Sequence, residues 1–136
     1  MSFKKTITVA AHDLDDLDHV NNVRYVQWIQ DISKEHWKAK APKHIQELYI
    51  WVVLTHNIAY KKPAQLRDKI IVKTHISESK GAVSIRIVEM YNAKTNILLL
   101  RSSTEWCLLN VKTHKPMRIS EELKNVFTKS KNIEAQ

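Results

Sequence analysis

The chain has 136 residues, of which 43% are hydrophobic and 26% are charged. This length and composition are typical of one globular domain, and they exclude two ordinary domains and a disordered chain. The formal net charge is +8, but residues 1–37 have four basic and six acidic side chains, whereas residues 38–136 have eighteen and eight. This asymmetry fits an anionic partner held beside the acidic segment, such as nucleic acid, a phosphate-bearing cofactor or an acidic carrier protein. It also fits a solvated, lysine-rich surface.

Only one glycine, Gly81, and one cysteine, Cys107, occur in the sequence. A Rossmann fingerprint, a P-loop and a G-x-S-x-G elbow each need at least two spaced glycines, so the chain contains none of them. A single cysteine forms no internal disulfide, and we expect Cys107 to be a buried thiol in a reducing cytoplasm. No apolar run approaches the roughly 18 residues that span a bilayer, and the N-terminus lacks the apolar segment of a signal peptide. We therefore expect a cytoplasmic protein without membrane association.

The first predicted element is a strand. Residues 3–11 alternate around Ile7 and Val9 as a half-buried strand does. A polar connection of residues 12–20 follows, and it contains four aspartates within six positions. This acidic run leads directly into a helical pattern.

The second predicted element is one long helix. It begins at Asn21 or Asn22, which are both good N-caps, and it ends before Pro42. Apolar residues cover so much of its circumference that other structure should wrap around it. Three of its residues are expected to be buried: Val26, Ile29 and Ile32.

Strand-forming residues dominate the rest of the chain. After a weak helical segment at residues 43–48, β-branched and aromatic residues predict strands at 49–60, 69–77, 82–91 and 97–111. Ser120 caps a short C-terminal helix. Strands and helices do not alternate, so the sheet should be antiparallel. The order predicts an α+β fold over residues 1–136, in which a five- to six-stranded antiparallel sheet is wrapped around one long helix.

The four aspartates before the helix fit no metal-binding pattern. A calcium loop needs a glycine at its sixth position, where Asp18 stands, and a glutamate at its twelfth, which is absent. The seven histidines show no zinc-binding spacing. One aspartate would be enough to cap the helix. The number of carboxylates therefore suggests that one of them is catalytic.

A carboxylate beside a helix N-terminus suits the hydrolysis of an acyl group. Free N–H groups in the first turn polarise a carbonyl oxygen. The carboxylate attacks the carbonyl carbon or deprotonates a water that does so. A thioester is a plausible target because thiolate is a good leaving group.

A family resemblance supports this chemistry. The run D-L-D-D-L-D-H-V-N-N-V-R-Y-V-Q-W resembles the D-x-D-x-x-G-H-V-N-N-x-x-Y-x-x-W motif of hotdog-fold acyl-CoA thioesterases of the 4-hydroxybenzoyl-CoA thioesterase group. It is also similar to the H-V-N-N-V-x-Y stretch of plant acyl-carrier-protein (acyl-ACP) thioesterases. Tyr60, Pro63 and Asp68 fit a looser downstream pattern. The resemblance covers about residues 5–123 and implies the hotdog fold.

The resemblance also implies the reaction, the partners and the site residues. The substrate would be acyl-CoA or acyl-ACP, no separate cofactor, metal ion or nucleic acid would take part, and the active site would form between protomers of a homodimer or homotetramer. The motif places the catalytic carboxylate at Asp15. The remaining expected residues are His19 and Asn22 for catalysis, and Asn21, Val20 and Tyr25 for substrate binding. Lys61 and Lys62 are expected to bind the phosphates of the substrate, and Lys80 and Arg86 are further candidates for that role.

The sequence departs from the motifs at three positions. Asp18 replaces the glycine of the first motif, which adds charge and bulk. In the plant group an asparagine would align with Leu17 and a glutamate near Pro63, so a simpler one-carboxylate mechanism is favoured. The alternatives are a hotdog-fold hydratase or dehydratase with an Asp–His pair, an inactive acyl-CoA-binding protein and a basic nucleic-acid-binding domain.

Overall fold

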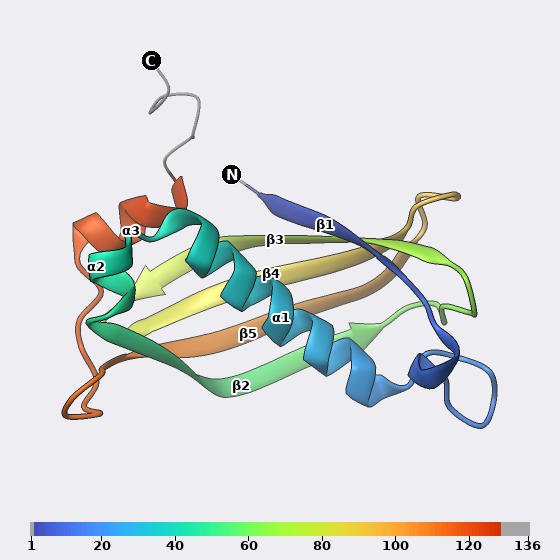
Figure 1. The fold of residues 1–136 in the computed structure, drawn as a ribbon, viewed down its shortest axis with the longest axis horizontal. Helices are drawn as coiled ribbons and strands as arrows, with labels where there is room; N and C mark the ends of the chain where they lie inside the picture. Colours follow the sequence, from blue (N-terminus) through green and yellow to red (C-terminus); the bar gives the residue numbers. More distant parts are fainter. Residues whose placement is uncertain (1, 129–136) are drawn as a thin grey trace, which may run out of the picture.

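The computed structural model describes residues 2–128. The predicted domain runs to residue 136, so Met1 and residues 129–136 lie outside the described part. The elements follow the predicted order (Figure 1). The strands are β1 (Phe3–Thr8), β2 (Tyr49–Tyr60), β3 (Lys69–Lys80), β4 (Val83–Asn92) and β5 (Leu98–Asn110). The helices are a short 3₁₀ turn, η1 (Ala11–Asp13), followed by α1 (Asn22–Lys40), α2 (Lys43–Gln46) and α3 (Glu121–Thr128).

The five strands form one sheet in the order β1-β3-β4-β5-β2. Every pair is antiparallel, and α1 crosses one face of the sheet (Figure 1). The predicted α+β architecture, an antiparallel sheet around one long helix, is therefore confirmed. The outer edges of β1 and β2 are unpaired in the described part of the chain.

Local chemistry at both ends sets the length of α1. Asn21 is the N-cap, and its side-chain oxygen accepts a hydrogen bond from the Val23 N–H at 3.0 Å. The helix ends at Lys40, and Ala41 is extended because the residue before a proline avoids helical geometry. The predicted helix boundaries are confirmed.

The buried stripe of α1 differs in part from the prediction. Ile29 and Ile32 are fully buried, as expected, together with Tyr25 and Trp28. Val26, however, is only half-buried. Steps of three and four residues carry the buried stripe through the aromatic positions, which leaves Val26 at its edge.

Other local differences follow from turns and a bulge. β1 ends at Thr8 because η1 begins at Ala11. β3 continues past the predicted end, residue 77: after a bulge between Ile76 and Glu78 its pairing with β4 resumes as far as Lys80. The thiol of Cys107 is buried, as predicted. In residues 2–128 no helix is long and apolar enough to cross a membrane.

Candidate active site

The N-terminus of α1 borders an open cavity of about 450 Å³. Seven of the eight residues expected in the active site line it, and Asn21, the helix N-cap, does not. The lining residues are Asp15, His19, Val20, Asn22, Tyr25, Tyr60, Lys61, Lys62 and Pro63. The fold thus brings together the end of the acidic connection, the first turn of α1 and the segment after β2.

The acidic connection closes on itself as a compact loop. Leu14 and Val20 form an antiparallel bridge, and the Asp15 N–H donates to the His19 carbonyl at 2.7 Å. Asp18 has a φ of 61°, a left-handed conformation that glycine adopts at little cost. This geometry explains why the motif has glycine at this position. The exposed Asp18 side chain does not line the cavity, so its bulk does not fill the cavity.

The Asp15 carboxylate has one fixed oxygen and one open oxygen. Its Oδ1 accepts hydrogen bonds from the N–H groups of Leu17 at 2.8 Å and His19 at 3.1 Å. Its Oδ2 has no hydrogen-bond partner within residues 2–128. The loop therefore orients the carboxylate and leaves one oxygen available to a ligand or water in the cavity.

Asp13 has a structural role instead. Its side chain is buried, and its Oδ1 lies 2.7 Å from Nε of Arg24. Its Oδ2 accepts a hydrogen bond from the Ala10 N–H at 2.8 Å. These contacts tie the connection to the first turn of α1. Asp16, like Asp18, is exposed, so Asp15 alone of the four aspartates lines the cavity.

The first turn of α1 presents one free donor. The Val23 N–H is capped by the Asn21 side chain, and the N–H groups of Arg24 and Tyr25 donate to the Asn21 carbonyl. For the Asn22 N–H, no acceptor lies within residues 2–128. Since Asn22 lines the cavity, its N–H is the donor best placed to bind a carbonyl oxygen there.

His19 contacts Asp15 through its backbone. Its N–H donates to the Asp15 carboxylate, and its carbonyl accepts from the Asp15 N–H. No hydrogen bond to the His19 ring occurs in the described part of the chain. The Asp–His side-chain pair that a hydratase would use is therefore not formed in this structure.

Tyr25 anchors the inner wall of the cavity. Its hydroxyl accepts a hydrogen bond from the Ala64 N–H at 3.2 Å, and the Ala64 carbonyl accepts from the Val20 N–H at 3.0 Å. Burial raises the pKa of the Tyr25 phenol; the hydrogen bond from Ala64 opposes this shift, and the charges of Tyr60, Asp68 and Asp15 add to it. The phenol stays neutral and holds Val20 and the segment after β2 in place.

The structure separates the four lysine and arginine candidates for phosphate binding. Lys61 and Lys62 are exposed at the cavity, where their backbone N–H groups donate to the Leu99 carbonyl. Lys80 is at the far end of β3 (Figure 1). For Arg86 the expectation was wrong: it is only 3% exposed, because the alternation of β4 directs it toward α1. Arg86 does not border this cavity.

Two further observations limit the chemistry of the site. Pro63 lines the cavity where the plant group would have a glutamate, so no second carboxylate is supplied there. Residues 2–128 contain no group of three or more His, Cys, Asp or Glu side chains placed to hold a metal ion.

Comparisons with solved structures show the same fold in thioesterases. The probable thioesterase YbaW of Escherichia coli superposes with a TM-score of 0.82 at 21% identity, over 90% of this chain and 94% of that chain. The 1,4-dihydroxy-2-naphthoyl-CoA thioesterase Slr0204 of Synechocystis gives 0.81 at 15% identity, over 96% and 98%. The 12:0-ACP thioesterase of Umbellularia californica gives 0.79 at 17% identity, over 93% of this chain and 49% of that chain. At these identities the likeness establishes the hotdog fold alone.

The sequence comparison identifies the family. None of the curated protein sequences matches this chain. The family model for the N-terminal domain of acyl-ACP thioesterases matches residues 1–127, nearly the whole chain. By that match, the chain belongs to the acyl-ACP thioesterase family, whose enzymes are thioester hydrolases.

Proposed function

We propose that this chain hydrolyses an acyl thioester of coenzyme A or acyl carrier protein at the cavity beside the N-terminus of α1. One observation carries the proposal: the open Oδ2 of Asp15 and the free N–H of Asn22 belong to residues that line the same cavity. A base and an oxyanion donor are the minimum set for acyl transfer to water.

The two groups divide the reaction between them. The Asn22 N–H, aided by the positive end of the α1 dipole, holds the thioester oxygen as it becomes negative. Asp15 takes a proton from a water whose oxygen attacks the carbonyl carbon, or attacks that carbon itself. In the first route the C–S bond then breaks, and the thiolate and the carboxylic acid leave. In the second route the thiolate leaves first, and water then hydrolyses the mixed anhydride formed with Asp15 to release the acid. No separate cofactor takes part in these steps.

The other lining residues position the substrate in this proposal. The His19 ring lies at the cavity wall, where it would donate a proton to the departing thiolate or hold the attacking water. Val20 and Tyr25 form the inner wall against the acyl group, and Asn21 keeps the helix N-terminus in place. Lys61 and Lys62 attract the phosphates of coenzyme A or an acidic carrier protein. In support, one structural neighbour, SAV2348 from Staphylococcus aureus, is described in complex with CoA.

Oligomerisation and location extend the proposal. Leu17 and Val23, which are close in sequence to the lining residues Asp15 and Asn22, have exposed apolar side chains. We infer that a second copy of the chain covers this region in a homodimer or homotetramer, as the family resemblance implies. A cytoplasmic location is supported by the unpaired, buried thiol of Cys107.

Release of free thiol from a panel of acyl-CoA and acyl-ACP substrates tests the proposal. Asp15→Asn keeps the side-chain size but removes the base, so turnover should fall by roughly 10²-fold or more. Asp16→Asn is the matched control, because Asp16 is exposed and does not line the cavity. Thermal melts establish that both variants fold. If Asp15→Asn turns over as fast as the wild type, Asp15 is not the catalytic carboxylate.

A further inference from the structure

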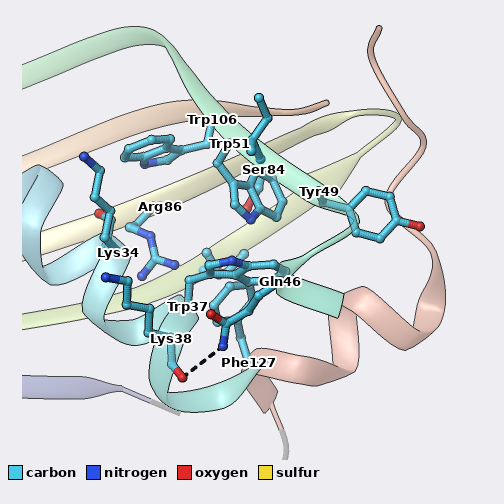
Figure 2. A pocket seen from close by; sticks show the side chains of 13 residues that line it. Lys34, Trp37, Lys38, Gln46, Tyr49, Trp51, Ser84, Arg86, Trp106 and Phe127 are labelled. Atoms are coloured by element: carbon cyan, nitrogen blue, oxygen red, sulfur yellow. Dashed lines mark hydrogen bonds between the residues drawn. The ribbon is translucent and has the colours of Figure 1, made fainter. Parts of the chain in front are cut away.

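A second cavity, of about 320 Å³, lies at the other end of α1 (Figure 2). It is formed by the second half of α1, the sheet and α3, and it shares no lining residue with the Asp15 cavity. The nearest lining residues of the two cavities on α1, Tyr25 and Ser33, are eight positions apart, which corresponds to about 12 Å along the helix. Between these points Trp28, Ile29 and Ile32 pack into the core. The two cavities are therefore distinct sites within one protomer.

A buried arginine forms part of this cavity. Arg86 is 3% exposed, and its Nη1 donates to Thr74 Oγ1 at 2.9 Å and lies 2.9 Å from His36 Nδ1. Its guanidinium also lies 5.2 Å from the ring centre of Phe127. Within residues 2–128 no carboxylate forms an ion pair with it.

The partners of Arg86 carry no compensating negative charge. Burial, with the positive charges of Arg86 and Lys40, lowers the pKa of His36 to about 3, so near neutral pH its ring is uncharged and accepts the hydrogen bond. Thr74 is neutral as well. A buried charge without an opposite charge is destabilising. Burial accordingly lowers the pKa of Arg86 to about 9.

Three further buried polar groups of the cavity lack partners. Trp51 Nε1, Trp106 Nε1 and Ser84 Oγ have no hydrogen-bond partner in the described part of the chain, and all three residues line the cavity. An indole N–H only donates. Most buried polar groups in folded proteins are hydrogen-bonded, so a cluster of unused donors beside an uncompensated cation indicates a missing acceptor.

The other lining residues indicate which apolar group the ligand has besides its acidic group. Aromatic rings of Trp37, Trp51 and Phe127 line the space, and Lys34 and Lys38 lie on the α1 side (Figure 2). Both lysines are exposed, so they attract an anion at the mouth without being buried themselves. The complementary ligand has an acidic group and an apolar body.

We propose that this cavity binds a small organic monocarboxylate, with its carboxylate on Arg86 and the unpaired donors and its apolar body against the aromatic rings. A single buried positive charge matches a monoanion better than a phosphate dianion, because the removal of two negative charges from water costs more free energy and only one of them would be compensated. The volume lies at the lower end of the about 300–1,000 Å³ typical of small-molecule sites. The acid released by thioester hydrolysis belongs to this chemical class, but binding here does not depend on that reaction.

Calorimetric titration of the purified protein tests the proposal with three probes: sodium octanoate, octan-1-ol and inorganic phosphate. The wild type should bind octanoate at least about tenfold more tightly than octanol, which is the usual scale of a charge-assisted hydrogen bond. Arg86→Met should remove that preference and leave octanol binding unchanged. Replacing a buried charge by an apolar residue of similar volume often preserves the fold.

Two further variants isolate the cause. Trp51→Phe keeps the aromatic ring but removes the N–H, so it should weaken octanoate binding more than octanol binding. Arg101→Met is the matched control, because Arg101 is exposed and pairs with Glu89 away from the cavity. No thioester is present, so the result is independent of hydrolysis. Equal affinity for octanoate and octanol, tighter binding of phosphate, or undiminished octanoate binding by Arg86→Met would each overturn the proposal.

Discussion

At the residue scale, the acidic run shows how neighbouring carboxylates acquire different roles. Asp13 is buried against Arg24, Asp15 lines the cavity beside the N-terminus of α1, and Asp16 and Asp18 are exposed. The sequence predicted a catalytic role for Asp15 only through its motif. It could not distinguish Asp13 as structural, because the pairing depends on Arg24, eleven residues away in the sequence.

A stability prediction follows from the backbone of Asp18. Its φ of 61° is unfavourable for a residue with a Cβ atom, so Asp18→Gly should raise the free energy of unfolding by up to about 1 kcal/mol. Asp16→Gly removes the same charge from the same loop, but Asp16 does not have a positive φ. It should lower the free energy of unfolding by about 0.5–1 kcal/mol. Urea unfolding of both variants measures the difference, and an equal change in both would contradict the backbone explanation.

At the scale of elements, the order of strands and helices could be predicted, but the contacts between them could not. Strand alternation, the Asn21 cap and Pro42 act locally, so the extents of α1 and β2 followed from the sequence. Arg86 was misplaced because its position depends on the pairing of β4 with β3 and β5. Charged residues are usually exposed, and alternation along β4 does not by itself show which face of the strand packs against α1. The second cavity therefore had no signal in the sequence.

The exposed apolar residues of α1 and β2 give a prediction about assembly. Val23 of α1 is 71% exposed and Leu54 of β2 is 53% exposed, and β2 is an edge strand. Such surface is more common at interfaces than on monomers. Light scattering during gel filtration should give a dimer or tetramer mass, and Val23→Lys with Leu54→Lys should shift it toward the monomer. A wild-type monomer at micromolar concentration would contradict the inferred assembly.

At the scale of the whole molecule, the charge asymmetry predicts how coenzyme A binds. Lys61 and Lys62 are exposed at the cavity beside the N-terminus of α1, and exposed charges are screened by salt. The dissociation constant for coenzyme A should therefore rise with ionic strength. Lys61→Gln with Lys62→Gln should reduce that dependence. Lys80→Gln is the control. Lys80 is the last residue of β3, about 35 Å along the strand from Lys69 at the other end. An equally reduced salt dependence with Lys80→Gln would indicate that the basic surface as a whole attracts coenzyme A, without a defined phosphate site.

The stability of the whole molecule should fall with acidity because of His36. Burial, Arg86 and Lys40 lower its pKa from 6.5 to about 3 in the folded state. Between these values the unfolded chain takes up a proton that the folded chain does not. The contribution of His36 to stability is thus complete above pH 6.5 and is lost toward pH 3, by up to about 1.4 kcal/mol for each pH unit.

Comparison of two variants isolates this effect from that of the carboxylates, which also titrate in acid. His36→Asn keeps an acceptor for Arg86 but does not titrate, so its free energy of unfolding should fall less steeply than that of the wild type between pH 6.5 and 3. His44→Asn replaces an exposed histidine and should keep the wild-type slope. Urea unfolding across this pH range measures all three. Parallel curves for His36→Asn and the wild type would show that His36 is protonated in the folded state, and the hydrogen bond from Arg86 to a neutral ring would then be wrong.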